Sequence, residues 1–132
     1  MISPDYLGDY ICPINNIATY SMKKSEIHFD INLDENNVPE DITWNATDKP
    51  GDDDDHTKAI SIAVWDDTEK NTMRLDLWTK DMPVDEMKKF YIESLSGLAQ
   101  NILTATGDEQ MSADINNLCE TLGKRLEKEL NQ

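Results

Sequence analysis

The stretch that decides the fold is KAISIAVWDDTEKNTMRLDLWTKDMP, residues 58–83. Apolar side chains take every second position on both sides of a polar interval: Ile60, Ile62, Val64, Met73, Leu75 and Leu77. Period-two alternation around a short polar loop predicts a β-hairpin. If Asp66 pairs with Asn71, the loop is residues 67–70, a common hairpin length. This register sets the two apolar rows opposite each other on one inward face, and a slip by one residue would turn one row to water.

Two more strands are predicted upstream, over residues 26–33 and 41–47, because both segments alternate apolar with polar side chains. The residues between them are rich in turn formers. If Asp34 pairs with Pro39, two further pairs follow: Ile31 with Ile42, and Phe29 with Trp44. An aromatic cross-strand pair of this kind adds roughly 0.2–1 kcal/mol.

After residue 83 the apolar period changes from two to three or four residues, which predicts a helix. Pro83 suits its first turn, Asp85 and Glu86 suit its positive end, and Gly107 is a natural stop. The expected apolar stripe is Val84, Met87, Tyr91, Leu95, Leu98, Ile102 and Ala105.

A second helix is expected to begin near Asp108 or Ser112. Its apolar stripe is Met111, Ile115, Leu118, Leu122, Leu126 and Leu130. The order ββββαα predicts an α+β fold, a four-stranded antiparallel sheet with the two C-terminal helices packed on one face. We expect residues 1–21 to be an irregular N-terminal extension and residues 22–132 to be a single domain.

The charge balance limits the possible partners. The 132 residues include 27 acidic and 12 basic ones, for a formal net charge of −15. This negative charge repels nucleic acids and anionic lipids, so we expect neither as a partner. The acidic residues serve either solubility or binding to a basic surface of a protein partner. The chain has no apolar run of membrane-spanning length and no N-terminal signal pattern, and its only cysteines, Cys12 and Cys119, lie far apart. We therefore expect a cytoplasmic protein without membrane insertion.

No residue pattern indicates a reaction centre, so we predict no enzyme activity, no catalytic residues, no cofactor and no metal. The acidic run 52–55, followed by His56, lacks the alternate spacing of a calcium loop and is interpreted as a solvated loop. His28 and Asp30 share a strand face, but two ligands do not make a metal site. An enzyme or metal protein would need a pocket in which His28 or the acidic run converges with other polar groups.

The outward face of the predicted hairpin carries the candidate partner-binding residues. Trp65, Arg74 and Trp78 share the phase opposite the apolar rows. Tryptophan and arginine are over-represented where protein partners bind. Two interpretations remain open: the N-terminal extension or a loop covers the rings, or the rings form a surface for a protein partner.

Several long blocks resemble the GldC family of gliding-motility-associated proteins of Bacteroidetes-type bacteria. The blocks are KKSEI (23–27), LDENNVPEDITWNATDKPG (33–51), KAISIAVWD (58–66), NTMRLDLWTKDMPVDEMKKFY (71–91) and LAQNILTATGDE (98–109). The resemblance, over about residues 22–127, implies a small soluble helper of the gliding apparatus, which is itself linked to outer-membrane secretion. It carries over no catalytic residues. The implied partner is a component of the gliding or secretion machinery, and a homo-oligomer is also possible.

The order ββββαα is also similar to that of the SecB class of export chaperones, which are acidic and oligomeric. No motif is shared, and a fold does not fix a function. The analogy implies an alternative function, in which the protein holds an unfolded or basic client by its apolar segments. Such a binder would expose an apolar groove of roughly several hundred Å² in its assembled oligomer.

Overall fold

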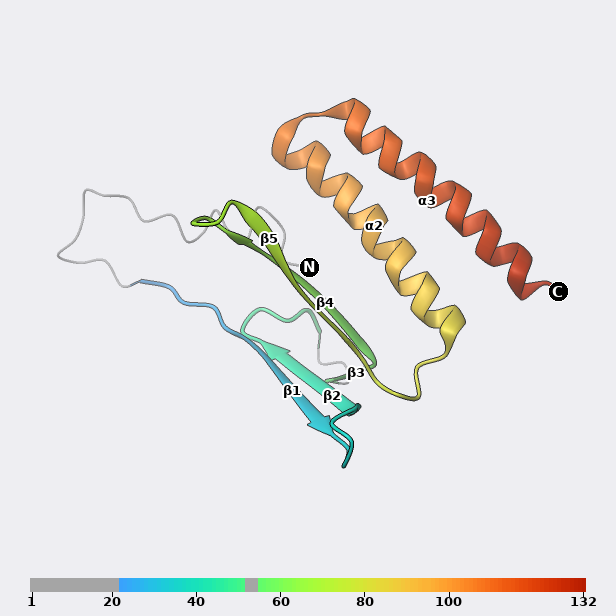
Figure 1. Cartoon of the computed structure of the whole chain (residues 1–132). Coiled ribbons are helices and arrows are strands. Elements are labelled where there is room, and N and C mark those ends of the chain that lie inside the picture. The colour runs from blue at the N-terminus through green and yellow to red at the C-terminus, as the bar shows by residue number, and fades with distance from the viewer. Residues whose placement is uncertain (1–21, 52–54) are drawn as a thin grey trace. The chain divides into compact units, whose positions relative to one another are not determined.

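The computed structural model describes residues 22–51 and 55–132 (Figure 1). The chain divides into two compact units, and of the described residues one contains the strands (Ser25–Met87) and the other most of the helical part (Lys88–Gln132). The packing of the helices on a sheet face and the single domain over residues 22–132 stay predictions. The predicted extension over residues 1–21 lies outside the described residues.

The first two strands pair nearly as the alternation predicts. β1 (Ile27–Leu33) is antiparallel to β2 (Pro39–Ala46), and both predicted pairs are confirmed: Ile31 with Ile42, and Phe29 with Trp44, whose stacked rings lie 6.2 Å apart. The pairing of Asp34 with Pro39 is wrong, because the register shifts at the end of β1 and Pro39 pairs with Leu33. The Asp34 carboxylate instead caps the turn by accepting from the N–H groups of Asn36 and Val38 at 2.8 and 3.0 Å.

The strands form two antiparallel sheets, which corrects the prediction of one four-stranded sheet. β3 (His56–Thr57) pairs with β2 at Ile42 and Thr43, so the first sheet has the order β1-β2-β3. The chain then bends at Lys58, and β4 (Ala59–Asp66) and β5 (Asn71–Trp78) pair only with each other. The short β3 occupies the edge of β2 that β4 would need for a continuous sheet.

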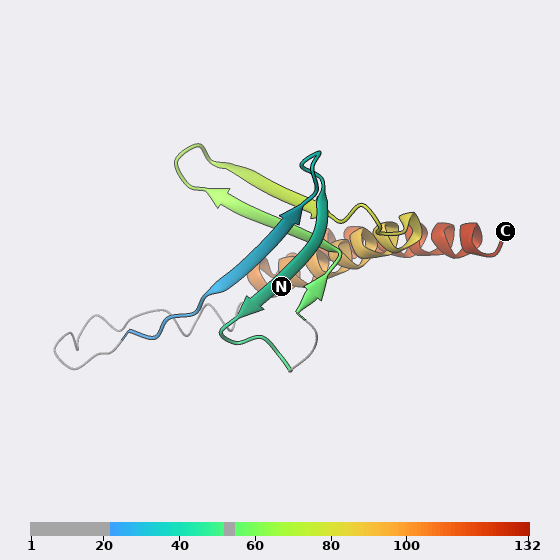
Figure 2. The same ribbon diagram turned by 90° about the horizontal axis from the view of Figure 1, so that it is seen from below.

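Hydrogen bonds near residue 80 attach the hairpin to the first sheet. The N–H of Lys80 donates to the carbonyl of Pro39 in β2 at 3.0 Å, next to the bond from the N–H of Thr79 to the carbonyl of Lys58 at 2.8 Å, which continues the hairpin ladder. The Lys80 ammonium lies 3.2 Å from a carboxylate oxygen of both Asp34 and Glu40. The hairpin is therefore held at its base, and its tip projects away from β1 and β2 (Figure 2).

The core of the strand unit is small and lies at that base. Ile42 is fully buried, and Ala59, Ile60 and the polar Thr79 are buried as well. Toward the tip the inward apolar row becomes exposed, with Val64 at 51%, Met73 at 55% and Leu75 at 50%. Within the strand unit, therefore, no other strand buries the outer half of the row.

The two helices are α2 (Val84–Thr106) and α3 (Glu109–Leu130). Gly107 separates them at φ +73°, a conformation that favours glycine, and its N–H donates to the carbonyl of Leu103. Asp108 is the N-cap of α3, and its carboxylate accepts from the N–H of Met111 at 2.9 Å. The predicted stop at Gly107 and the predicted start near Asp108 are both confirmed.

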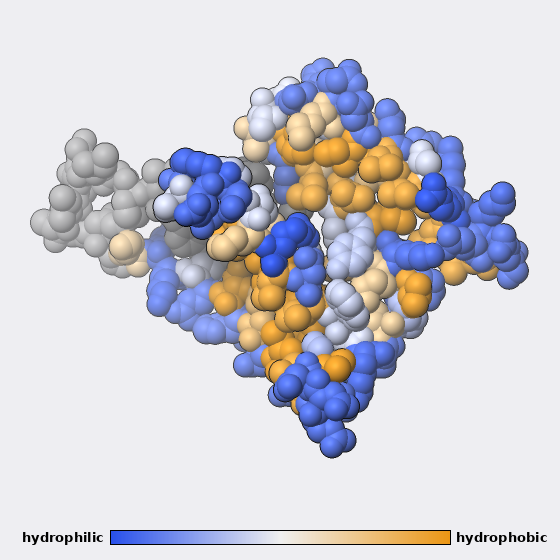
Figure 3. All heavy atoms as spheres, in the orientation of Figure 1, coloured by the Kyte–Doolittle hydropathy of each residue, from blue (hydrophilic) through white to orange (hydrophobic). Residues whose placement is uncertain are grey.

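Side-chain contacts along their length hold the helices as an antiparallel pair. The Ser112 hydroxyl donates to the carbonyl of Ala99 at 2.8 Å, and both residues are buried. At the other end, Lys88 pairs with Glu129 at 2.7 Å. Hydrophobic residues, coloured orange in Figure 3, gather on the face of the helix pair that this view shows. Among the described residues, no helix is both long enough and apolar enough to cross a bilayer.

Candidate interaction surface on the β4–β5 hairpin

The hairpin turn fixes which residues share a face. Asp66 pairs with Asn71 and the loop is residues 67–70, so the predicted register is confirmed. The Asp66 carboxylate accepts from the N–H groups of Thr68 and Glu69, and its carbonyl accepts from the N–H of Lys70 at 2.8 Å. Lys70 takes φ +56° to close the turn. One aspartate thus organises the loop and leaves both strands in register.

The register brings the three candidate partner-binding residues to one face. The cross-strand pairs on that face, from tip to base, are Trp65 with Thr72, Ala63 with Arg74, Ser61 with Asp76, and Ala59 with Trp78. The two tryptophans therefore mark opposite ends of the face, and Arg74 lies between them. Small residues on β4 leave space above that strand for the longer side chains of β5.

Both indole rings are accessible. Trp65 is 58% exposed and Trp78 is 49% exposed. Within residues 22–51 and 55–132, then, no loop buries either ring. The alternative in which the N-terminal extension covers the rings concerns residues outside that part of the chain. The exposure of both rings is consistent with binding of a protein partner, and that binding stays a prediction.

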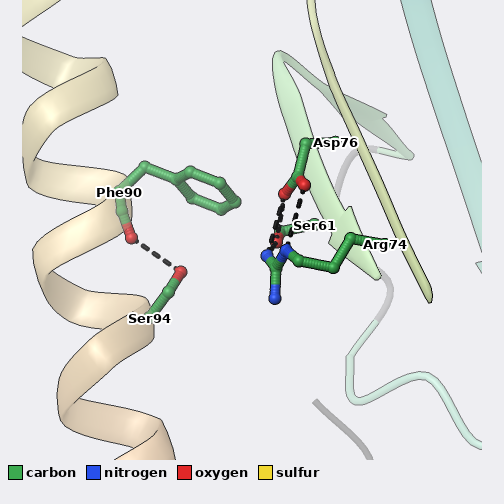
Figure 4. Close-up of polar contacts among 5 residues, drawn as sticks. All are labelled: Ser61, Arg74, Asp76, Phe90 and Ser94. Carbon is green, nitrogen blue, oxygen red and sulfur yellow. Dashed lines mark hydrogen bonds and ion pairs between the residues drawn. The ribbon is translucent and has the colours of Figure 1, made fainter. Parts of the chain in front are cut away.

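Between the tryptophans lies a polar cluster of Arg74, Asp76 and Ser61 (Figure 4). The Arg74 guanidinium donates to the Asp76 carboxylate from Nε at 3.2 Å and from Nη2 at 3.0 Å. Its Nη2 also donates to the Ser61 hydroxyl at 2.6 Å, and that hydroxyl donates to Asp76 Oδ1 at 2.6 Å. The hydrogen bonds from Arg74, followed by the one from Ser61, lower the pKa of Asp76.

Sequence reasoning singled out Arg74 but missed Ser61 and Asp76. The signal was present, because the predicted register already sets Ser61 opposite Asp76 and one step from Arg74. The cluster holds one cation and one anion, so this face is close to neutral within a strongly acidic chain. Two exposed indoles flanking a compensated charge pair suit a partner surface with an apolar and a hydrogen-bonding component.

A second polar feature is a shallow pocket of about 270 Å³ at the base of the hairpin. Its lining residues are Glu40, Asp41, His56, Thr57, Lys58, Thr79 and Asp81. His56 Nδ1 lies 2.8 Å from Asp41, and Lys58 lies 3.6 Å from Asp81. A hydrogen bond from the Thr79 hydroxyl, and then the charge of Lys58, lower the pKa of Asp81. Opposite charges thus pair along the walls of this pocket.

The other candidate ligands that the structure describes do not gather around a common point. His28 Nε2 lies 3.1 Å from the Glu26 carboxylate on an exposed strand face, and Asp55 pairs with Lys49 at 2.8 Å. Residues 52–54 lie outside the described residues. Among residues 22–51 and 55–132, no three His, Cys, Asp or Glu side chains are placed to hold a metal ion.

Comparison with known proteins gives one family. The family model described as "Gliding motility-associated protein GldC-like" matches residues 39–128. The match covers β2 through most of α3 and includes the whole hairpin; β1 and the preceding block 23–27 lie outside it. No curated protein and no solved structure matches the chain.

Proposed function

Because the chain belongs to the GldC-like family of gliding-motility-associated proteins, we propose that it is a non-enzymatic, cytoplasmic accessory of bacterial gliding that acts through protein contacts. The observation that carries the proposal is the face of the β4–β5 hairpin that bears Trp65, Arg74 and Trp78, with both indole rings exposed. Its partner is a protein component of the gliding or secretion machinery. The family match includes the residues of this face, and this supports the proposal that the face contributes to the gliding role of the family.

The charge distribution supports a protein partner. The chain carries a net charge of −15, whereas the Arg74–Asp76 pair leaves the centre of the face compensated. The acidic surroundings would attract a basic partner over a distance and repel nucleic acid. The exposed indoles would then supply the short-range contact area.

The test replaces both indoles in a gliding host. In cells with Trp65→Ala and Trp78→Ala, we expect loss of surface gliding at an unchanged level of the protein. The matched control is Leu118→Ala with Leu130→Ala, which removes similarly exposed apolar side chains, 48% and 59%, from α3. A photo-crosslinking amino acid at position 65 is expected to join the protein to one gliding or secretion component. Normal gliding of the double tryptophan variant would reject the proposed surface.

The exposed apolar row on the reverse of the hairpin favours a second candidate function. Val64, Met73 and Leu75 each expose half or more of their surface, as a SecB-like client binder requires of its binding face. In this function the protein would slow aggregation of a chemically unfolded basic client. Met73→Ser with Leu75→Ser should abolish that activity, whereas Trp65→Ala with Trp78→Ala should leave it intact. The opposite result would favour the accessory role.

A further inference from the structure

The outer edge of β1 is the longer of the two edges of the first sheet. In the order β1-β2-β3 the edges belong to β1, with seven residues, and to β3, with two (Figure 1). Among the described residues, no strand pairs with the outer edge of β1. Very short strands, lysine and proline protect such edges, and residues 27–33 contain neither lysine nor proline. The edge of β1 is therefore a template for a further strand.

The hydrogen bonds of β2 show which backbone groups of β1 face outward. The N–H of Thr47 donates to the carbonyl of Glu26 at 3.0 Å, so this pair is a bonded one. The N–H of Trp44, the partner of Phe29, donates instead to the carbonyl of Asp55 on the other side of β2. Because bonded and non-bonded pairs alternate, the residues of β1 that direct their backbone groups outward are Ile27, Phe29, Ile31 and Leu33. Among residues 22–51 and 55–132, no hydrogen bond reaches these outward groups.

The sequence of β1 is complementary to itself in one register. When two antiparallel copies pair around Phe29, Ile27 of each copy faces Ile31 of the other. The outward groups of both strands then meet, so the hydrogen-bonding phase agrees. His28 of each copy faces Asp30 of the other, and an imidazole N–H can donate to a carboxylate. In the part of the chain that the structure describes, no hydrogen bond or ion pair reaches the exposed Asp30 side chain, so this pairing gives it a partner.

The neighbouring registers set like residues opposite each other. A shift by two residues is the smallest that keeps the hydrogen-bonding phase. In one direction it sets Asp30 against Asp30, and in the other it sets Glu26 against Asp30 and His28 against His28. Like charges directly opposite each other destabilise a strand pair. Pairing around Ile31 would run into the register shift at the end of β1, so the register around Phe29 is favoured.

The same register extends a row of aromatic rings across both copies. Phe29 stacks on Trp44 with the ring centroids 6.2 Å apart. With Phe29 opposite Phe29, the rings follow in the order Trp44, Phe29, Phe29, Trp44 over the strands β2-β1-β1-β2. Aromatic neighbours of this kind stabilise a contact beyond the area that they bury. The pairing also sets Ile31 of the second copy beside Ile27, which is 40% exposed.

Net charge restricts where two copies can meet. Each copy carries a charge of −15, so the copies repel one another and need a contact without opposed acidic residues. Residues 27–33 contain a single acidic residue, Asp30, and one of the two histidines of the chain. The two-fold arrangement sets these two residues against each other at both of their positions. The charge of β1 is therefore complementary to that of a second β1.

We propose that the protein forms a two-fold dimer by antiparallel pairing of β1 with β1 around Phe29, giving a continuous sheet of the order β3-β2-β1-β1-β2-β3. The pairing uses no residue of the β4–β5 hairpin, so each copy keeps its own Trp65–Arg74–Trp78 face. The dimer does not depend on the proposed gliding partner, because the purified chain alone is expected to form it.

The first experiment measures mass and changes the charges of the pair. By sedimentation equilibrium, the full chain should approach twice 15.1 kDa as its concentration rises. His28→Asp alone and Asp30→Arg alone should each stay at 15.1 kDa, because neither variant can set an acidic residue against a basic one. An equimolar mixture of the two should return to the doubled mass, since only the mixed pair restores both contacts. A wild-type chain that stays monomeric, or a mixture that does not associate, overturns the proposal.

Two controls separate this contact from folding and from total charge. The His28 side chain is 70% exposed and Asp30 is exposed, so both variants should fold, as far-UV circular dichroism will report. Lys89→Gln lowers the net charge by one unit, as His28→Asp does, at a similarly exposed position on α2, and it should still dimerise. A monomeric Lys89→Gln would mean that total charge controls association, and it would reject the role of β1.

The second experiment tests the register by disulfide formation. His28 and Asp30 of the two copies form a non-bonded pair, where Cα atoms about 4.5 Å apart allow a disulfide. A mixture of His28→Cys and Asp30→Cys should therefore crosslink under mild oxidation with oxidised glutathione. Either variant alone should not, because identical positions lie diagonally, about 7–8 Å apart, and the wild type controls for the native cysteines. Crosslinking of the mixture that does not exceed that of either variant alone rejects pairing around Phe29, whether or not the charge variants fold.

Discussion

Arg74 and Asp76 are joined along a single strand, with Nε and Nη2 of the arginine donating to the two carboxylate oxygens at 3.2 and 3.0 Å. Two parallel bonds between a guanidinium and a carboxylate are stronger and more directional than one. Both side chains lie on the face that carries the exposed indoles. This pair therefore determines the local electrostatics at the centre of the candidate surface.

The first prediction concerns the titration of that pair. The bonds from Arg74 hold the pKa of Asp76 below its ordinary value of 3.8. The stabilisation is therefore complete above pH 3.8 and is lost as the pH falls through the lower, folded-state pKa. Arg74→Gln should raise the pKa of Asp76 toward 3.8, measured from its carboxyl carbon shift by NMR. Lys89→Gln, which removes an exposed ion pair on α2, should leave it unchanged.

The second prediction compares two glycines. Gly123 lies within α3, and an added Cβ meets nothing within 4 Å, so Gly123→Ala should stabilise the protein by about 0.5–1 kcal/mol. Gly107 also has open space but holds φ +73°, so Gly107→Ala should destabilise by about 1–2 kcal/mol. Urea unfolding followed by far-UV circular dichroism gives both values. Similar changes for both variants would mean that backbone conformation does not govern them.

The third prediction concerns the small core. Ile42 is fully buried where β2 meets both β1 and β3, so Ile42→Ala should cost about 2–5 kcal/mol of unfolding free energy. Val64→Ala, near the exposed tip, should cost about 0.5 kcal/mol or less. Urea unfolding followed by tryptophan fluorescence measures both losses. A large loss at Val64 would show that something covers the tip in solution.

The alternation of apolar and polar residues was enough to predict most local pairings. It placed Ile31 opposite Ile42 and Asp66 opposite Asn71, because a slip by one residue moves a whole apolar row to the wrong face. Gly107 and Asp108 predicted the helix boundary because left-handed backbone and N-cap positions select few residue types.

The number of sheets could not be predicted in the same way. Alternation reports which face a residue occupies and does not report which strand lies beside it. The two-residue β3 is too short to produce a period, yet it takes the edge of β2 and separates β4 from the first sheet. For the same reason, alternation assigned Val64 and Leu75 to the core, although no other strand of their unit buries them.

Residue type alone could not identify Ser61 and Asp76 as the polar partners of Arg74 in the candidate surface. Trp65, Arg74 and Trp78 stood out as residue types common at interfaces, whereas Ser61 is common everywhere. Its role depends on a hydroxyl 2.6 Å from both Arg74 and Asp76, which only the register of β4 against β5 specifies.

The last prediction concerns the junction that holds the hairpin to the first sheet. Hydrogen bonds to Glu40 and Asp34 raise the pKa of Lys80 above its ordinary 10.5, so its stabilising charge is present below that pH and is lost as the pH rises through the raised value. Lys80→Met should remove this anchor and speed hydrogen exchange of the amide at position 80, which donates to the Pro39 carbonyl, by about threefold to tenfold. Lys80→Arg keeps the charge and should retain slow exchange, and Lys70→Met, at the hairpin tip, should leave that amide unaffected. Exchange at position 80 is read by NMR near neutral pH. If Lys80→Met exchanges at the wild-type rate, backbone pairing alone holds the junction, and the two ion pairs contribute nothing to it.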